Sequence, residues 1–144
     1  MRPLRSMSEE ETLAAGAALA AGLAPDGILL LSGELGSGKT VLARGVARGL
    51  GIDPREVQSP TFNLIREHRG SGGSLVHVDL YRLEPEETAA LGLEELLAGP
   101  GVKVVEWAER LPSAVSSSLR GALWLRLSRR PDGGRDIVEA ATTT

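Results

Sequence analysis

One short segment constrains the fold of this chain more than any other. Residues 33–40 read GELGSGKT and match the pattern G-x-x-x-x-G-K-[ST]. The apolar run ILLLS precedes it at residues 28–32, and residues 39–50 carry apolar side chains at helical spacing before Gly51. A strand, a glycine-rich loop and a helix in this order bring backbone amides together around phosphate groups. The segment therefore predicts a P-loop, with a nucleotide site made by Gly33, Glu34, Leu35, Gly36, Ser37, Gly38, Lys39, Thr40 and Val41.

Two side chains of this loop have expected roles. Lys39 is one of two lysines in the sequence, and its compact ammonium would contact the β- and γ-phosphates in a way that the planar guanidinium of arginine cannot reproduce. The Thr40 hydroxyl would be a ligand of Mg²⁺, which prefers oxygen donors. We therefore expect Mg²⁺ as cofactor and a nucleoside triphosphate as substrate.

A magnesium nucleotide site also needs a carboxylate at the end of a neighbouring strand. Residues 75–79 (LVHVD) and 102–106 (VKVVE) each predict a buried strand that ends in an acid. Parallel strands place such ends at the carboxyl edge of the sheet, beside the phosphate loop. On this reasoning either Asp79 or Glu106 is the metal-binding acid. His68 and His77 fall in different strands without a carboxylate pattern, so structural or solvated roles are expected for both.

The other predicted elements give an α/β chain. Ser8 and Glu11 form a predicted capping box that opens a helix over residues 8–23. This interpretation is preferred to an export signal, because Glu9 to Glu11 precede a run of only twelve uncharged residues. Further along we expect a helix over residues 84–98 and a strand over 102–107. Hairpins are predicted from strands 63–69 and 75–81, and from strands 122–127 and 137–140. The sum is a P-loop NTPase-like three-layer sandwich with a mixed sheet that includes β-hairpins.

Length and composition narrow the functional classes. The 144 residues suit a single P-loop domain, 1–144, with a flexible C-terminus at residues 141–144. The absence of cysteine excludes thiolate catalysis, disulfides and cysteine metal sites. The net charge of −3 disfavours a protein that coats nucleic acid without sequence specificity. No apolar stretch is long enough to span a membrane, so the chain is expected to be cytoplasmic.

Charge is nevertheless distributed unevenly along the chain. Residues 84–109 hold seven glutamates and one lysine, whereas residues 120–135 hold five arginines and one aspartate. These segments form either two solvated faces, or one face for a protein partner and an arginine hairpin that approaches tRNA or an acidic surface.

Four stretches in a fixed order, taken together, resemble one family. They are GELGSGKT at residues 33–40, SPTF at 59–62, HVDLYRL at 77–83 and VEWAERL at 105–111. In this order they are similar to the TsaE family, formerly called YjeE, and the resemblance extends over roughly residues 13–127. The family is the ATPase component of the bacterial machinery that makes threonylcarbamoyladenosine on tRNA.

The resemblance implies a set of residue roles. Lys39 and Thr40 match the phosphate and magnesium positions, Glu106 the metal-binding acid, and Asp79 the functional aspartate of the HxDLYR motif. Trp107, which general principles place more often in a core, matches a tryptophan beside the nucleotide, and Thr61 falls in a switch-like segment. The chain departs from the family at Val41 and Ala108, which leaves the edges of the base pocket open.

The resemblance also implies Mg-ATP binding, slow hydrolysis, partnership with TsaB and TsaD, and at most an indirect or weak contact with tRNA. ATP is preferred to GTP because the single asparagine, Asn63, is followed by leucine and no N-K-x-D motif exists. The expected function is that of a switch or reset ATPase, which does not itself catalyse the transfer. Two other functions remain open: a small-molecule kinase, and an adaptor in which nucleotide binding matters and hydrolysis is incidental.

Overall fold

A seven-stranded mixed sheet forms the centre of the computed structural model, which describes residues 2–58, 64–84, 86–87 and 92–140. The strand order is β1-β7-β6-β2-β5-β4-β3, and the four central strands β6, β2, β5 and β4 are mutually parallel. The strands are β1 (Leu4–Ser6), β2 (Ile28–Gly33), β3 (Ile65–Gly70), β4 (Gly73–Asp79), β5 (Val102–Glu106), β6 (Leu123–Arg129) and β7 (Arg135–Glu139).

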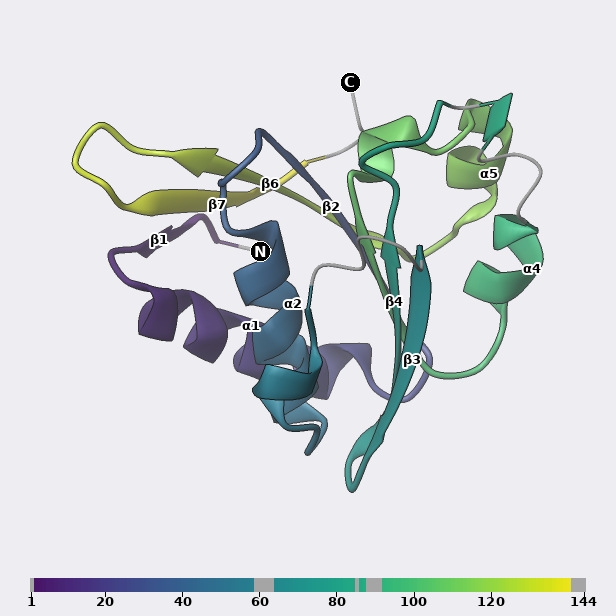
Figure 1. Ribbon diagram of the computed structural model, residues 1–144, viewed down its shortest axis with the longest axis horizontal. Coiled ribbons are helices and arrows are strands. Elements are labelled where there is room, and N and C mark those ends of the chain that lie inside the picture. The colour runs from purple at the N-terminus through teal and green to yellow at the C-terminus, as the bar shows by residue number, and fades with distance from the viewer. Residues whose placement is uncertain (1, 59–63, 85, 88–91, 141–144) are drawn as a thin grey trace.

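Helices cover both faces of this sheet (Figure 1). One face carries α1 and α2, and the other carries α4 and α5. The helical segments are α1 (Glu9–Leu23), α2 (Lys39–Gly49), α4 (Leu93–Ala98) and α5 (Ser113–Ser118), with short 3₁₀ turns η1 (Pro54–Glu56) and η2 (Ala108–Arg110). The predicted three-layer α/β fold is confirmed.

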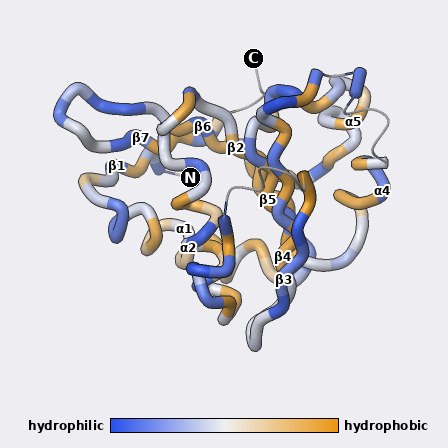
Figure 2. The backbone as a smooth tube through the Cα atoms, viewed as in Figure 1, coloured by the Kyte–Doolittle hydropathy of each residue, from blue (hydrophilic) through white to orange (hydrophobic). Residues whose placement is uncertain are grey.

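The central strands are buried on both faces because their side chains alternate between two apolar cores. Leu29 and Leu31 of β2 pack with α1 and α2, whereas Leu30 packs in the second core, against α4 and α5. Figure 2 shows the hydrophobic stretches gathered along the middle strands, while the loop that joins β6 to β7 is hydrophilic. This pattern explains why residues 28–32 read as a continuous apolar run rather than an alternating one.

Most of the predicted elements are present, with small shifts at their ends. The Ser8 half of the capping box is confirmed, since Ser8 Oγ accepts the Glu11 amide at 3.1 Å, whereas the Glu11 carboxylate accepts the amide of Met7, one residue before the N-cap, at 2.6 Å. The first hairpin is tighter than expected, since β3 and β4 are joined by Ser71 and Gly72 alone. The second hairpin, β6 and β7, has longer strands than expected.

One helix prediction is wrong. The segment 84–98 is not a continuous helix, because Gly92 adopts φ +68° and α4 begins only at Leu93. Residues 85 and 88–91 of this segment lie outside the described residues, as do residues 141–144, for which flexibility was predicted. Four described elements were not predicted: β1, which pairs antiparallel with β7, the helix α5, and the 3₁₀ turns η1 and η2.

Candidate functional site

The phosphate loop joins the end of β2 to the start of α2. Gly36 and Gly38 hold left-handed φ values of +77° and +103°, which other residues rarely adopt, and Gly38 is the N-cap of α2. No side chain caps this helix, and its first turn carries no acidic residue. The free amides and the positive end of α2 therefore favour an anion at this position.

Lys39 lies inside the loop and is only 4% exposed. Its ammonium donates to the carbonyl oxygens of Gly33 and Glu34 at 2.6 and 2.9 Å, and to Ser37 Oγ at 3.3 Å. Burial lowers the pKa of Lys39, while nearby carboxylates, Glu106 first among them, act in the opposite direction. The loop thus holds a buried cation whose positive charge is supported by surrounding oxygens.

The two candidate acids end neighbouring strands, as predicted, and Asp79 is the register partner of Glu106. Glu106 is 2% exposed, and its Oε1 accepts the Thr40 hydroxyl at 2.7 Å. Asp79 is also buried, and its Oδ1 accepts the Tyr81 amide at 2.9 Å, in a turn after β4. The structure therefore brings Thr40 to Glu106, whereas Asp79 contacts the adjacent turn.

These oxygens fit a magnesium ion. Mg²⁺ is commonly held by one or two protein oxygens together with water and substrate phosphates. Thr40 Oγ1 and Glu106 Oε1 supply two such oxygens at the N-terminus of α2. Among the described residues there is no group of three or more His, Asp or Glu side chains that could hold a metal ion.

His77 is a residue of this site that the sequence analysis missed. It is fully buried in β4, and its Nε2 lies 2.5 Å from Glu106 Oε2. The signal was present in the strand period: Leu75, His77 and Asp79 share one face of β4, and Leu75 packs in the core beneath α2. What the sequence did not provide was the register that places this face beside Glu106.

Trp107 contacts both the core and the phosphate loop. It packs against the core of α4 and α5, and its ring also faces the phosphate loop, with Lys39 Nζ 4.0 Å from the ring centroid. Tyr81 stacks on it at 4.9 Å between centroids, with the rings tilted by 42°. Its φ of +58° is a strained conformation for a residue with a side chain, and it turns the chain from β5 into η2.

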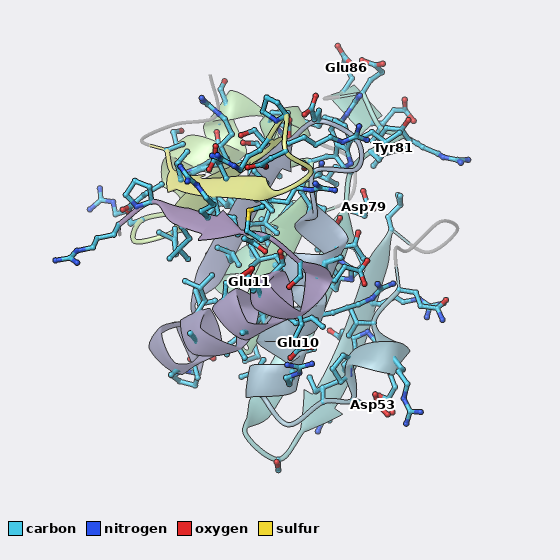
Figure 3. The ribbon with its side chains drawn as sticks, turned by 90° about the vertical axis from the view of Figure 1, so that its left-hand side faces the viewer. Glu10, Glu11, Asp53, Asp79, Tyr81 and Glu86 are labelled. Atoms are coloured by element: carbon cyan, nitrogen blue, oxygen red, sulfur yellow. The ribbon has the colours of Figure 1, made fainter. Side chains whose placement is uncertain are left out.

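A cavity of about 430 Å³ opens over this loop. Its walls include most of the predicted nucleotide-binding residues: Leu35, Gly36, Gly38, Lys39, Thr40, Val41 and Trp107. Asp79 and Glu106 lie at one side (Figure 3 labels Asp79 and Tyr81 at this end of the sheet). The remaining loop residues contact Lys39, whose ammonium donates to oxygens of Gly33, Glu34 and Ser37. Thr61 lies outside the described residues.

The far wall of the cavity comes from parts of the chain that were not predicted to contribute. It includes Ser6, Ser8 and Thr12 at the start of the chain, and Gly133 and Arg135 of the β6–β7 hairpin. The pairing of β1 with β7 brings these two segments together. The volume is within the usual range for small-molecule pockets, roughly 300–1,000 Å³.

The arginine hairpin is not a freely available basic surface. Arg130 pairs with Asp132 and Asp136, at 3.2 and 3.1 Å. Arg129 turns back to the phosphate loop and donates to the Leu35 carbonyl at 3.2 Å, and Arg135 donates to the Gly133 carbonyl at 2.8 Å. Intramolecular contacts thus already use part of the predicted positive charge.

No helix within the described ranges is both long enough and apolar enough to cross a membrane.

Comparisons with known proteins point to one family. The family model described as "Threonylcarbamoyl adenosine biosynthesis protein TsaE" matches residues 6–137. A Bacillus subtilis protein named "tRNA threonylcarbamoyladenosine biosynthesis protein TsaE" is 39% identical over 137 residues, which cover 95% of this chain and 84% of that protein. A Treponema pallidum protein of the same name is 35% identical, over 94% of this chain and 97% of its own.

A solved structure gives the same result for the fold. The crystal structure of Bacillus subtilis YdiB is 36% identical and superposes with a TM-score of 0.70, covering 96% of this chain and 83% of that one. With matches in sequence and in structure over nearly the whole length, the chain belongs to the TsaE family.

Proposed function

We propose that this protein binds Mg-ATP in the cavity above the phosphate loop and hydrolyses it slowly. It would act as a switch or reset component of the machinery that forms threonylcarbamoyladenosine at position 37 of tRNAs, without catalysing the transfer. The observation that carries the proposal is the 2.7 Å contact between Thr40 and Glu106 at the N-terminus of α2, beside the buried Lys39 ammonium.

The residues of the loop account for triphosphate binding. Backbone amides at the start of α2 would hold the phosphate oxygens, and Lys39 would redirect its N–H groups from the loop carbonyls to the β- and γ-phosphates. The Lys39 ammonium already donates to three loop oxygens, so breaking these hydrogen bonds would offset part of the free energy gained from the phosphates. We expect a binding site that exchanges nucleotide rather than retaining it.

The magnesium ion would be held by Thr40 Oγ1 and Glu106. When bound, it neutralises the charge that develops on the phosphates. Asp79, held by the Tyr81 amide, would orient a water, the metal shell or a conformational switch, and Thr61 would respond to the γ-phosphate. These roles make Lys39, Asp79 and Glu106 the proposed catalytic set.

The far wall of the cavity would receive the ribose and base. The Ser8 hydroxyl and the Arg135 guanidinium line the cavity there, as does Trp107, while the Ser6 and Thr12 hydroxyls already bond to each other and to the Ser8 carbonyl. Adenine is the proposed base, because no N-K-x-D motif is available to select guanine.

The names of the relatives support the biological setting. They describe tRNA threonylcarbamoyladenosine biosynthesis, and a role on tRNA implies action in the cytoplasm. TsaB and TsaD are the proposed partners, and contact with tRNA itself would be indirect or weak, consistent with the net charge of −3.

Incubation with γ-labelled ATP tests the proposal. Inorganic phosphate should be the labelled product, slowly with the protein alone, and the Glu106→Gln variant should lose most of this release. Transfer of label to a metabolite from an extract would instead identify a kinase.

A second experiment separates the switch from the adaptor. Purified TsaB, TsaD and tRNA are combined with the wild type or with Glu106→Gln, and modified adenosine is measured over several rounds. The proposal expects the variant to stop repeated rounds. Undiminished rounds with a variant that binds but does not hydrolyse ATP would favour the adaptor.

A further inference from the structure

His77 lies in β4, between β5 and the edge strand β3, has no exposed surface, and contacts a residue of the proposed metal site. Its Nε2 is 2.5 Å from Glu106 Oε2, and both side chains are almost fully buried, 0% and 2% exposed. Its other ring nitrogen, Nδ1, has no hydrogen-bond partner among the described residues. Within the described part of the chain, the imidazole therefore has one polar contact, and that contact is Glu106.

This arrangement selects one form of the ring. A buried N–H without an acceptor is unfavourable because it loses its hydrogen bond to water, so a proton on Nδ1 is disfavoured. The neutral tautomer with its proton on Nε2 leaves only a lone pair unpartnered and donates a charge-assisted hydrogen bond to the carboxylate. His77 is thus a fixed donor to Glu106 Oε2.

The two oxygens of Glu106 consequently have separate tasks. Oε2 is held by His77 from β4, and Oε1 accepts the Thr40 hydroxyl from α2. The imidazole is fully buried on β4, which pairs with β5, and close packing around a buried ring restricts its rotation with the carboxylate. A carboxylate fixed at one oxygen presents the other in one direction, toward Thr40.

We infer that His77 is a positioning residue that sets the affinity of this site for Mg²⁺ by holding the Glu106 carboxylate in place. The inference rests on the proposed function, since it takes Thr40 and Glu106 as the metal ligands. Groups that orient a metal ligand through a hydrogen bond typically change metal affinity or activity by about 10–100-fold when they are removed. His77 would therefore act on the metal without touching either metal or nucleotide.

The test compares three variants by direct binding rather than by turnover. ATP affinity is measured by calorimetry in EDTA and across a series of Mg²⁺ concentrations, and Mn²⁺ binding with ATP is followed by electron paramagnetic resonance. His77→Leu removes the donor at similar size, His77→Gln keeps an N–H near the position of Nε2, and Glu106→Gln removes the carboxylate charge.

His77→Leu should weaken Mg²⁺ and Mn²⁺ binding in the presence of ATP by about 10-fold or more, and leave ATP affinity in EDTA unchanged. His77→Gln should restore metal affinity to within about threefold of the wild type. In a Glu106→Gln background, His77→Leu should lower metal affinity by less than about twofold, because His77 acts on the metal through Glu106. A purely structural role would lower the melting temperature without this pattern. If His77→Leu does not fold, His77→Asn, too short to reach Glu106, replaces it with the same expected loss.

The possible outcomes distinguish a failure of this inference from a failure of the proposed Mg-ATP site. If the wild type binds ATP equally well with and without Mg²⁺, the proposed metal site fails. Two results would overturn only the inference, provided that ATP binding by the wild type depends on Mg²⁺. In the first, His77→Leu keeps wild-type metal affinity. In the second, His77→Leu lowers metal affinity by the same factor in the Glu106→Gln background as in the wild type, so that His77 has no positioning role.

Discussion

Gly45 of α2 lies at a close approach between the phosphate-loop helix and α1, and its replacement by alanine is a sharp test of how α2 is held. A Cβ added at Gly45 would lie 2.3 Å from the Leu13 carbonyl oxygen and 2.9 Å from the Gly16 Cα. Both are backbone atoms of α1, so no side chain can rotate away. Ordinary contact begins near 3.4 Å, and the two helices would have to separate by roughly 1 Å.

The magnitude follows from two opposing effects. Overpacking of this kind lowers the free energy of unfolding by about 1–3 kcal/mol, whereas alanine in place of glycine within a helix raises it by about 0.5–1 kcal/mol. The net expectation for Gly45→Ala is a loss of up to about 2.5 kcal/mol in the free energy of unfolding, with a midpoint of about 1.3 kcal/mol, which corresponds to roughly 4 °C in melting temperature for a chain of this length. Gly22 of α1 is the matched control, because nothing lies within 4 Å of its added Cβ.

Urea denaturation followed by circular dichroism measures both variants. Gly22→Ala should be neutral or more stable than the wild type by up to about 1 kcal/mol, so the two variants should differ by about 2 kcal/mol. Equal stability of Gly45→Ala and Gly22→Ala would refute the close contact between the helices, and with it the account of how α2 is positioned under the phosphate loop.

Three further predictions concern single side chains. Lys103→Met should lower the free energy of unfolding by about 1.5–3 kcal/mol in chemical denaturation, because the buried Lys103 ammonium donates to the Asp26 and Gly99 carbonyls; an unchanged denaturation midpoint would contradict this role. Ser8→Ala should cost about 1 kcal/mol by the same assay through loss of the α1 N-cap, and a cost near zero would show that the capping box adds nothing. Since burial lowers the pKa of Lys39, this lysine loses its charge at a lower pH than an exposed lysine does. ATP affinity measured by calorimetry should therefore fall as the pH rises through that pKa, and binding should be accompanied by proton uptake. An ATP affinity that stays constant up to the ordinary pKa range of lysine would count against the loop geometry.

The local parts of this fold could be predicted from the sequence because their causes are local. The phosphate loop is specified by glycines at positions that require positive φ, the start of α1 by Ser8 and Glu11, and the central strands by apolar runs buried on both faces. The same locality explains the error at residues 84–98, where apolar spacing suggested one helix but the left-handed Gly92 interrupts it.

The parts that could not be predicted depend on pairings between distant residues. β1 is three residues long and exists because it pairs with β7, near the other end of the chain. This pairing brings Ser6 and Arg135 to one wall of the cavity, which no local pattern indicates. The contact between His77 and Glu106 likewise needs the register of β4 on β5. The predicted site residues around the loop were recognisable because the loop motif itself fixes their geometry.

Calorimetry of Mg-ATP binding to wild type, Lys39→Ala and Arg55→Ala tests the central claim most directly. Arg55 is an exposed cation paired only with neighbouring Asp53 among the described contacts, so its replacement removes the same charge away from the cavity. Wild type and Arg55→Ala should bind alike, whereas Lys39→Ala should lose one or more charge-assisted contacts of about 1.5–3 kcal/mol each, at least about tenfold in affinity. No heat of binding from well-folded wild type, or unchanged affinity in Lys39→Ala, would contradict the account.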